Sequence, residues 1–447
     1  MLATRRHLRR LRASASRLLS TPARAGREDR ASYQNTTATA DPLLGSLRAF
    51  DPARPLLNFS PGPTSIPRPV MRQIDSELSS WQGCGLSAME LSHRSPEFLA
   101  IKEDCEATMR RVVFAGDNEG ASEDFELLFC HGGGHAQFAA VPLNLCAAPR
   151  ARAHYFITGT WSARAAAEAA KFCHVTETGS AEGWWQPPSE LALVEPSDDN
   201  PAYAYICSNE TVNGIEFFDF PDLPSHVPLC VDMSSDFCSK PVCYSKIGVA
   251  FACAPKNIGI PGLTVVLVRK SLLRDRHAQA NTPGILDWSV GQANDCLWNT
   301  PATFNIYVTG LVMNWIEAEG GLVEMERRSR AKAELIYAAI DESAGFYATP
   351  EYLRVGAGAE AGAAEAMRSR MNVPFVVRGV DGVGVEEEVR MTEAFVKEAF
   401  ERNIVGLRTQ TPFGFGRFLR ASLYNAVTVS DAETLAEFMR GFQTRHL

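Results

Sequence analysis

The middle of the chain alternates short apolar runs with helix-like segments, and this alternation limits the possible folds more than any other feature. The runs occupy residues 125–130, 154–158, 202–208, 227–232, 248–254 and 263–268. Helix-like segments follow the first two runs, at 136–148 and 161–173. Strands that alternate with helices predict an α/β domain with a mostly parallel sheet. Because only eight residues separate the last two runs, we expect them to be antiparallel neighbours that form an edge pair of a mixed sheet.

Helix signals lie on both sides of this region. Ser95 and Pro96 are typical of a helix N-cap and first turn, and they predict a helix that continues to residue 113. After residue 300, two helical stretches follow at 303–321 and 323–342. A pair of glycines separates them, so we expect two helices that connect the large sheet to a smaller C-terminal domain.

The C-terminal part has its own pattern of elements. A strand is predicted at 370–379, a helix at 386–403 and a second strand at 418–426. Ser430 and Glu433 match a capping box at the start of the last helix. This order predicts a smaller α+β domain beside the sheet.

We therefore divide the chain into three parts. Residues 1–47 form a disordered leader, residues 48–340 a large domain with an N-terminal arm, and residues 341–447 the small domain. The low-complexity tract at 356–366 is predicted to be a surface insertion, because loop-closure entropy grows only slowly with length.

The leader has the composition of an organelle transit peptide. Its first 27 residues contain eight arginines and no acidic residue, with leucines that would form an apolar stripe on a helix. No apolar core precedes a small-residue cleavage site, which argues against a secretory signal. We expect import into the mitochondrial matrix, with the plastid stroma as the alternative.

Charge and composition exclude several classes of function. Without the eight leader arginines the net charge of −8 becomes −16, and such an acidic body argues against nucleic-acid binding. No run of 18 apolar residues exists, so no membrane helix is expected. Eleven cysteines occur without CxxC pairs, so we expect neither a disulfide framework nor a metal site.

Lys256 and Asp232 are the first candidate catalytic residues. Lys256 lies in the turn between the last two apolar runs, and Asp232 ends the run before them. A lysine amine beside a strand end and an aspartate at a neighbouring strand end suit a pyridoxal phosphate enzyme, in which the lysine forms a Schiff base and the carboxylate keeps the pyridine nitrogen protonated. Considered alone, the spacing favours a solvated turn lysine over a catalytic one, so the rest of the chain must decide.

A glycine-rich segment suggests an anion site. The sequence CHGGGHAQF at 130–138 follows a predicted strand and opens a predicted helix, where backbone N–H groups can bind phosphate. It is not the GxGxxG pattern of dinucleotide sites, and a plain tight turn is the alternative.

Aromatic, hydroxyl and guanidinium side chains complete the set of candidates. Trp161 follows a strand and could stack on a flat ring or simply pack, and Thr211 could donate to a ring oxygen or bond its own backbone. Arg420, inside an apolar strand, and Arg94, in a loop, have the geometry to bind a carboxylate or phosphate in bidentate fashion.

These pieces, in this order, resemble the phosphoserine aminotransferase family, class-V aminotransferases of the pyridoxal phosphate fold-type I superfamily. The resemblance covers about residues 56–445. It is carried by NFSPGP, SAMELSHRS, CHGGGHAQFAAVPLNL, SNETVNGIEF, VDMSSD, KNIGIPGLTVV, NTPATF, SRMNVPF and RASLYNA. It implies the cofactor pyridoxal 5′-phosphate, glutamate with 2-oxoglutarate as one substrate pair, and 3-phosphohydroxypyruvate with phosphoserine as the other.

The resemblance also implies roles for residues that bind the cofactor. Lys256 matches the Schiff-base lysine, Asp232 the partner of the pyridine nitrogen, Trp161 the stacking aromatic and Thr211 the group near the ring hydroxyl. Gly134 and His135 match the phosphate cradle, and Pro255 occupies the cofactor-binding position before the lysine.

The remaining roles that the resemblance implies lie between subunits or at the substrate. It implies a homodimer with shared active sites, in which Asn299 and Thr300 reach the cofactor phosphate of the other subunit. Arg420 matches the residue that binds the substrate α-carboxylate. His93 and Arg94 match the pair that crosses the interface toward the distal acidic group of the substrate.

The sequence differs from the family pattern at four places. His135 occupies a cradle position where Arg or Ser is common, and Pro61 stands where a small residue is usual. Pro255 replaces the usual Gln, and the segment at 408–418 lacks the family's His-Arg pair that binds the substrate phosphate. An aminotransferase for another acidic 2-oxo acid, such as a sulfonate or dicarboxylate, and a cofactor-binding pseudoenzyme therefore remain as alternatives. A cysteine desulfurase on the same fold is disfavoured, because no cysteine follows Cys296.

Overall fold

The computed structural model describes most of the chain after the leader. The described residues are 51, 54–116, 121–148, 150–179, 201–275, 278–350, 353, 367–379, 384–407 and 418–447. The predicted leader at 1–47, the insertion at 356–366 and residues 408–417 lie outside them.

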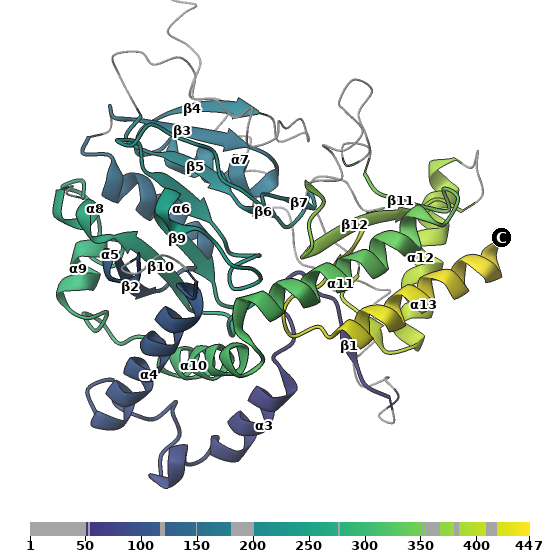
Figure 1. Cartoon of the computed structure of the whole chain (residues 1–447), viewed down its shortest axis with the longest axis horizontal. Helices are drawn as coiled ribbons and strands as arrows, with labels where there is room; N and C mark the ends of the chain where they lie inside the picture. The colour runs from purple at the N-terminus through teal and green to yellow at the C-terminus, as the bar shows by residue number, and fades with distance from the viewer. Residues whose placement is uncertain are drawn as a thin grey trace, which may run out of the picture.

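A seven-stranded mixed sheet forms the centre of the larger part (Figure 1). In spatial order its strands are β2 (Phe125–Cys130), β10 (Thr264–Arg269), β9 (Ile247–Cys253), β8 (Leu229–Asp232), β5 (Ala204–Cys207), β3 (Arg152–Ile157) and β4 (His174–Gly179). Strand β10 is antiparallel to both of its neighbours, whereas the pairs from β9 to β4 are parallel. The predicted α/β fold with a mostly parallel mixed sheet is therefore confirmed.

The position of the antiparallel pair differs from the prediction. β9 and β10 do pair antiparallel, but they are not an edge pair, because β2 pairs with the outer side of β10. The side chains of β10 explain this arrangement. Val265 and Leu267 are buried in the core on one face of the sheet, and Val266 and Val268 are buried on the other. Burial on both faces fits a sheet that helices cover on both sides, and the pairing with β2 places β10 inside it.

Helices cover both faces of this sheet (Figure 1). Helices α4 (Pro96–Val113) and α10 (Thr303–Ala318) pack on one face, with Phe98 and Met313 among the buried side chains. Helices α6 (Gly133–Leu145) and α7 (Thr160–Ala169) cover the other face. The predicted N-cap of α4 is confirmed, since the Ser95 hydroxyl accepts a hydrogen bond from the amide of Phe98.

Shorter elements connect these layers. The larger part also contains α3 (Arg68–Glu77), η2 (Trp81–Gly83), α5 (Ala121–Asp124), β6 (Asn209–Glu210), β7 (Ile215–Glu216), η4 (Tyr244–Lys246), α8 (Lys270–Asp275) and α9 (Trp288–Ala293). Strands β6 and β7 form a hairpin that points toward the C-terminal part (Figure 1).

The described residues of the C-terminal part form a three-stranded antiparallel sheet and three helices. The sheet has the order β11 (Tyr347–Ala348), β12 (Asn372–Val377) and β14 (Leu419–Ser422). It packs with α11 (Gly321–Asp341), α12 (Val385–Glu401) and α13 (Val429–His446) around a core that includes Phe395 and Phe442.

The N-terminal arm contributes to this same core. Strand β1 (Leu57–Asn58) pairs in parallel with β13 (Ile404–Val405), and Leu57 and Phe59 are buried among C-terminal side chains. Helix α11 contributes from Ala333 onward. The boundary at residue 340 stays a prediction, and in the structure the arm packs with the C-terminal core.

The last helix begins two residues earlier than predicted. Thr428, not Ser430, is the N-cap, and its hydroxyl accepts from the amide of Asp431 at 3.1 Å while the Asp431 carboxylate accepts from the amide of Thr428 at 2.9 Å. This Thr-x-x-Asp box already satisfies the first amides, so Ser430 lies inside the helix and Glu433 is not the reciprocal partner. Among the described residues, no helix has the length and apolar character needed to cross a membrane.

Candidate active site

Lys256 lies at the carboxyl edge of the sheet, in the turn between β9 and β10. Its Nζ donates a hydrogen bond to Thr211 Oγ1 at 3.1 Å and lies 5.7 Å from the centre of the Trp161 ring. Three predicted site residues from separate segments therefore meet. Burial works against the charged amine, but electrostatic interactions with Tyr424, Cys253 and Asp232 outweigh it, so the pKa of Lys256 is raised.

Asp232 is the last residue of β8, the strand next to β9. Its carboxylate is buried, and Oδ1 accepts from the amide of Ser234 at 2.9 Å. Burial raises the pKa of Asp232, while hydrogen bonds from Ser234 and the charge of Lys256 act in the opposite direction. A buried carboxylate of this kind is suited to pair with a protonated ring nitrogen.

The glycine-rich segment joins β2 to α6 and opens that helix. Gly132 is the N-cap with a φ of 88°, and a Cβ there would lie 2.5 Å from Ala136 Cβ. Gly134 lies close to Cys253, which precedes Lys256 by three residues. The first-turn amides of this 13-residue helix, together with its dipole, form a site suited to phosphate.

Trp161 and His135 form the wall beside this cradle. Their rings meet edge to face, with centroids 5.9 Å apart. Desolvation by the surrounding protein, followed by the charge of Arg164, lowers the pKa of His135. Within the described residues, the buried Trp161 Nε1 has no hydrogen-bond partner.

Arg420 reaches the site from the C-terminal part. It is buried in β14, and its Nη1 donates to the backbone oxygen of Thr211 at 2.7 Å. Thr211 therefore contacts Lys256 through its hydroxyl and Arg420 through its carbonyl. A guanidinium at this point is suited to a substrate carboxylate.

The four residues predicted to act across a subunit interface are not part of this group. His93 and Arg94 lie before α4, where Arg94 is exposed. Asn299 and Thr300 are also exposed, and Asn299 Nδ2 lies 3.4 Å from His131 Nε2 of its own chain. Within the described part of one chain, none of the four forms a hydrogen bond with Lys256, Thr211 or Trp161.

The donors and acceptors around Lys256 fit pyridoxal phosphate. A lysine amine, a buried carboxylate, a tryptophan face and a helix N-terminus match the aldehyde, the ring nitrogen, the ring face and the phosphate of that molecule. Pro255 has no N–H to donate, and its carbonyl accepts from the amide of Thr64 at 3.2 Å.

The sequence profile of the family Aminotransferase class-V matches residues 56–435. The chain belongs to the class-V aminotransferase family. It is 40% identical over 395 residues to phosphoserine aminotransferase 2, chloroplastic, of Arabidopsis thaliana. This match covers 88% of this chain and 85% of that protein. It is 39% identical to a phosphoserine aminotransferase of Burkholderia orbicola, over 87% of this chain and 99% of that protein.

Solved structures agree with this assignment. A phosphoserine aminotransferase from Bacillus circulans subsp. alkalophilus superposes with a TM-score of 0.75 at 33% identity, and the match covers 88% of this chain and 99% of that one. A phosphoserine aminotransferase from Trichomonas vaginalis, solved with pyridoxal phosphate bound, gives a TM-score of 0.73 at 32% identity, over 86% of this chain and all of that one. The predicted fold type and the predicted cofactor of this class-V aminotransferase are confirmed.

Two residues that contact the site of this class-V aminotransferase were missed in the sequence. Glu210 and Asn213 flank Thr211 and hydrogen-bond to the start of α7, which carries Trp161. The motif SNETVNG drew attention to the threonine alone. A carboxylate and an amide in one turn can accept from helix amides, but no local pattern identifies a helix start that lies 49 residues away in the sequence.

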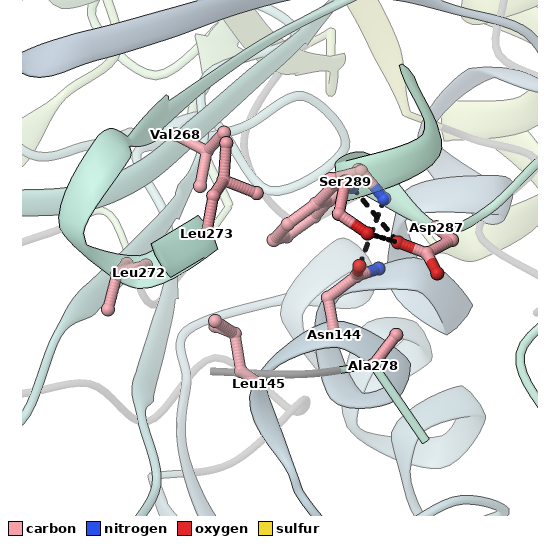
Figure 2. Close-up of a pocket in the computed structure, with 9 residues that line it drawn as sticks. Asn144, Leu145, Val268, Leu272, Leu273, Ala278, Asp287 and Ser289 are labelled. Atoms are coloured by element: carbon pink, nitrogen blue, oxygen red, sulfur yellow. Dashed lines mark hydrogen bonds between the residues drawn. The ribbon is translucent and has the colours of Figure 1, made fainter. Parts of the chain in front are cut away.

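Figure 2 shows a small pocket elsewhere in this class-V aminotransferase. It is lined by Asn144, Leu145, Val268, Leu272, Leu273, Ala278, Asp287, Trp288 and Ser289. The Asn144 amide nitrogen donates to the Leu286 carbonyl at 2.7 Å, and its oxygen accepts from the Trp288 amide at 3.0 Å. None of the predicted site residues lines this pocket, and its central polar side chain is already satisfied.

Proposed function

We propose that this chain is a phosphoserine transaminase of serine biosynthesis. It would transfer an amino group between glutamate and 2-oxoglutarate on one side, and 3-phosphohydroxypyruvate and phosphoserine on the other. The relatives that bear this name cover almost all of the chain after the leader. The observation that carries the proposal is the chain of contacts from Lys256 through Thr211 to Arg420.

Lys256 and Asp232 would perform the proton chemistry. When bound, pyridoxal phosphate supplies an electron-accepting ring that stabilises negative charge on the substrate carbon next to the amino group. Lys256 Nζ, displaced by the substrate amine, would take the proton from that carbon as general base and return a proton as general acid. Asp232 would keep a proton on the ring nitrogen.

The other site residues would bind and orient. The amides at the start of α6, with Gly134 and His135, would hold the phosphate, and Trp161 would cover the ring face. Arg420 would bind the substrate α-carboxylate.

We propose that two copies share their active sites. Large exposed apolar side chains are concentrated on α3, the loop after it and the start of α4, the region that carries His93 and Arg94. They are Met71, Leu78, Leu86, Met89 and Leu99. Trp298, beside Asn299 and Thr300, is 53% exposed as well. Burial of these side chains against a second copy would bring all four residues to the partner's Lys256 site.

The identity of the acidic group on the second substrate is the point at which a second candidate function differs from the first. The segment before Arg420 lacks the family's His-Arg pair, and residues 408–417 lie outside the described structure. An aminotransferase for a sulfonated or dicarboxylic 2-oxo acid is therefore the second candidate. A pseudoenzyme that binds the cofactor without turnover is the third, because Pro255 replaces the usual Gln.

We propose that residues 1–47 direct the protein to an organelle. Two of the relatives are named chloroplastic, which favours the plastid stroma over the mitochondrial matrix that we first expected. A fluorescent protein fused to residues 1–47, observed in plant cells, would separate the two organelles.

A substrate panel tests the proposed reaction. The purified protein, loaded with pyridoxal phosphate, is assayed with glutamate against 3-phosphohydroxypyruvate, sulfopyruvate and oxaloacetate, with Lys256→Ala as the control. We expect kcat/KM to be highest for the phosphorylated acid. Turnover of only the sulfonate or dicarboxylate would support the second candidate, and no turnover by a protein that still binds the cofactor would support the third.

A further inference from the structure

Glu210 has no assigned role, yet it lies between the main residues of the site. Its side chain is fully buried at the end of β6. Carboxylate oxygen Oε2 accepts from the amide of Trp161 at 2.8 Å, and Oε1 accepts from the amide of Ser162 at 2.8 Å. Both donors belong to the first turn of α7. The carboxylate thus holds the helix end that carries the stacking tryptophan.

Ser162 adds a third hydrogen bond whose direction the geometry fixes. Its hydroxyl accepts from the amides of Thr158 and Gly159, at 2.9 and 3.1 Å. The hydroxyl proton is therefore left to donate, and the nearest acceptor is Glu210 Oε1 at 2.6 Å. Glu210 accepts from three donors and donates to none of them, as an ionised carboxylate does.

Asn213 makes a second contact between the β6–β7 hairpin and the start of α7. Its Oδ1 accepts from the amide of Thr160 at 2.9 Å and from the Thr160 hydroxyl at 3.1 Å. A Cβ on Gly159 would lie 2.5 Å from Asn213 Oδ1 and 2.7 Å from Glu210 Cδ. The start of α7 is packed against the hairpin without room for a side chain between them.

The same hairpin is fixed to the C-terminal part. Gly214 has a φ of 72°, and a Cβ there would lie 2.3 Å from Pro374 Cδ on β12. The Gly214 carbonyl accepts from the amide of Ser369 at 2.9 Å. Asn209 donates to Asn372 Oδ1 at 2.8 Å. The hairpin therefore has little freedom to move relative to Arg420.

We propose that Glu210 is a positioning residue, whose carboxylate fixes the distance between Trp161 and the Lys256 amine. The inference rests on the proposed function, since it assigns Trp161 and Lys256 to opposite sides of one cofactor. Glu210 is followed directly by Thr211, which bonds to Lys256 and Arg420. One short segment thus connects the ring-covering residue, the reacting amine and the substrate-binding guanidinium.

A glutamine at this position would lose this function without a change in size. Its amide oxygen could accept from one of the two α7 amides, but its NH₂ group would face the other donor. The first turn of α7 would shift or lose a hydrogen bond, and Trp161 would move with it. A misplacement of about 1 Å costs roughly 100-fold in rate in well-packed active sites.

The experiment compares Glu210→Gln with Glu177→Gln, the same change on an exposed residue of β4. The first readout needs no cofactor: acrylamide quenching of the Trp161 fluorescence, obtained by subtraction of a Trp161→Phe background. We expect Glu210→Gln to increase the quenching of Trp161 at least twofold, and Glu177→Gln to leave it unchanged. Unchanged quenching in Glu210→Gln would overturn the proposal.

The second readout is kinetic and uses the cofactor-loaded enzyme. We expect kcat to fall about 10- to 100-fold in Glu210→Gln, with the KM for glutamate changed by less than threefold. A higher KM for glutamate with an unchanged kcat would contradict a positioning role. If the wild-type enzyme has no transaminase activity, the proposed function fails, while the quenching result still decides whether Glu210 positions Trp161.

A milder variant covers the case in which Glu210→Gln does not fold. Ser162→Ala keeps the carboxylate and removes one of its three donors. We expect a smaller increase in Trp161 quenching than in Glu210→Gln, and a kcat reduced about 3- to 10-fold. Normal quenching and normal kcat in a folded Ser162→Ala protein would overturn the proposal.

Discussion

The guanidinium of Arg420 donates to the backbone carbonyl of Thr211 at 2.7 Å, across the junction between the C-terminal part and the large sheet. The hydroxyl of Thr211 also accepts from the Lys256 amine. Thr211 therefore contacts both the proposed substrate-binding residue and the proposed catalytic residue. A shift of the C-terminal part relative to the large sheet would therefore move Thr211 and change its hydrogen bond with Lys256.

Replacement of Arg420 by lysine should weaken substrate binding far more than a conservative change normally does. Lysine cannot bond to the Thr211 carbonyl and a carboxylate in the same planar geometry. We expect kcat/KM for glutamate to fall about 100- to 1,000-fold, equivalent to roughly 3–4 kcal/mol. The measurement is steady-state kinetics, with Arg402→Lys, at the C-cap of α12, as the control.

Asp232→Asn should make the cofactor-free protein more stable at neutral pH while it removes activity. Burial raises the pKa of Asp232, so the folded chain binds this proton more tightly than the unfolded chain does. The contribution of Asp232 to stability is therefore present at low pH, and it is lost as the pH rises from about 4 through the folded pKa. Urea unfolding of both proteins from pH 4 to pH 7 checks this, since the advantage of the variant should grow with pH. A stability difference between Asp232→Asn and wild type that becomes smaller as the pH rises would contradict a raised pKa for Asp232.

Lys332 should give the free energy of unfolding a pH dependence in the opposite direction. This buried lysine of α11 donates to the carbonyls of Leu423, Tyr424 and Val427 at 2.8, 2.8 and 2.9 Å, and burial lowers its pKa to about 7. The unfolded chain binds this proton more tightly, so stability should rise with pH from about 7 to 10.

Lys332→Met is the variant that tests this effect. It should cost about 1–3 kcal/mol of stability at pH 7, because three buried carbonyls lose their donor. It should also flatten the rise in stability between pH 7 and 10. A rise of equal slope in wild type and variant would show that another group causes it.

The sequence was a good guide wherever a contact is local. The longer buried strands, the helices α4, α6, α7, α10, α11, α12 and α13, and the turn that holds Lys256 could be placed from apolar runs and helix signals, whereas the short elements α5, α8, α9, β1, β6, β7, β11 and β13 were not predicted. β4 was missed because His174–Gly179 is a polar, partly exposed strand at the sheet edge, without the apolar run that marks a buried strand. The interior position of β10 depends on its pairing with β2, more than 130 residues away, which no local pattern specifies.

The site shows the same division. Arg420 was found because a charge inside an apolar strand is costly unless it is matched. Lys256 and Asp232 were found because an amine and a carboxylate at neighbouring strand ends suit a pyridoxal phosphate enzyme. Glu210 was missed because its partners Trp161 and Ser162 are almost 50 residues away in the sequence. The capping box at Thr428 was misplaced because two overlapping S/T-x-x-D/E patterns occur within six residues.

Shared active sites can be tested by complementation between two inactive variants. In a mixed dimer of Lys256→Ala and Arg94→Ala, one site would contain both defects and the other neither, if Arg94 acts on the partner subunit. We therefore expect the mixture to regain activity, up to about one quarter of that of wild type on the basis of random pairing. Subunits must be exchanged first, by dilution from mild denaturant. An exchanged mixture that stays inactive would place Arg94 outside the partner's site.

The most direct test of the central claim is a single half-reaction. The protein is loaded with pyridoxal phosphate, freed of excess cofactor and mixed with phosphoserine in the absence of any 2-oxo acid. The account predicts close to one equivalent of 3-phosphohydroxypyruvate per active site in wild type, and none in Lys256→Ala. No product from a wild-type protein that has bound one cofactor per site would contradict it.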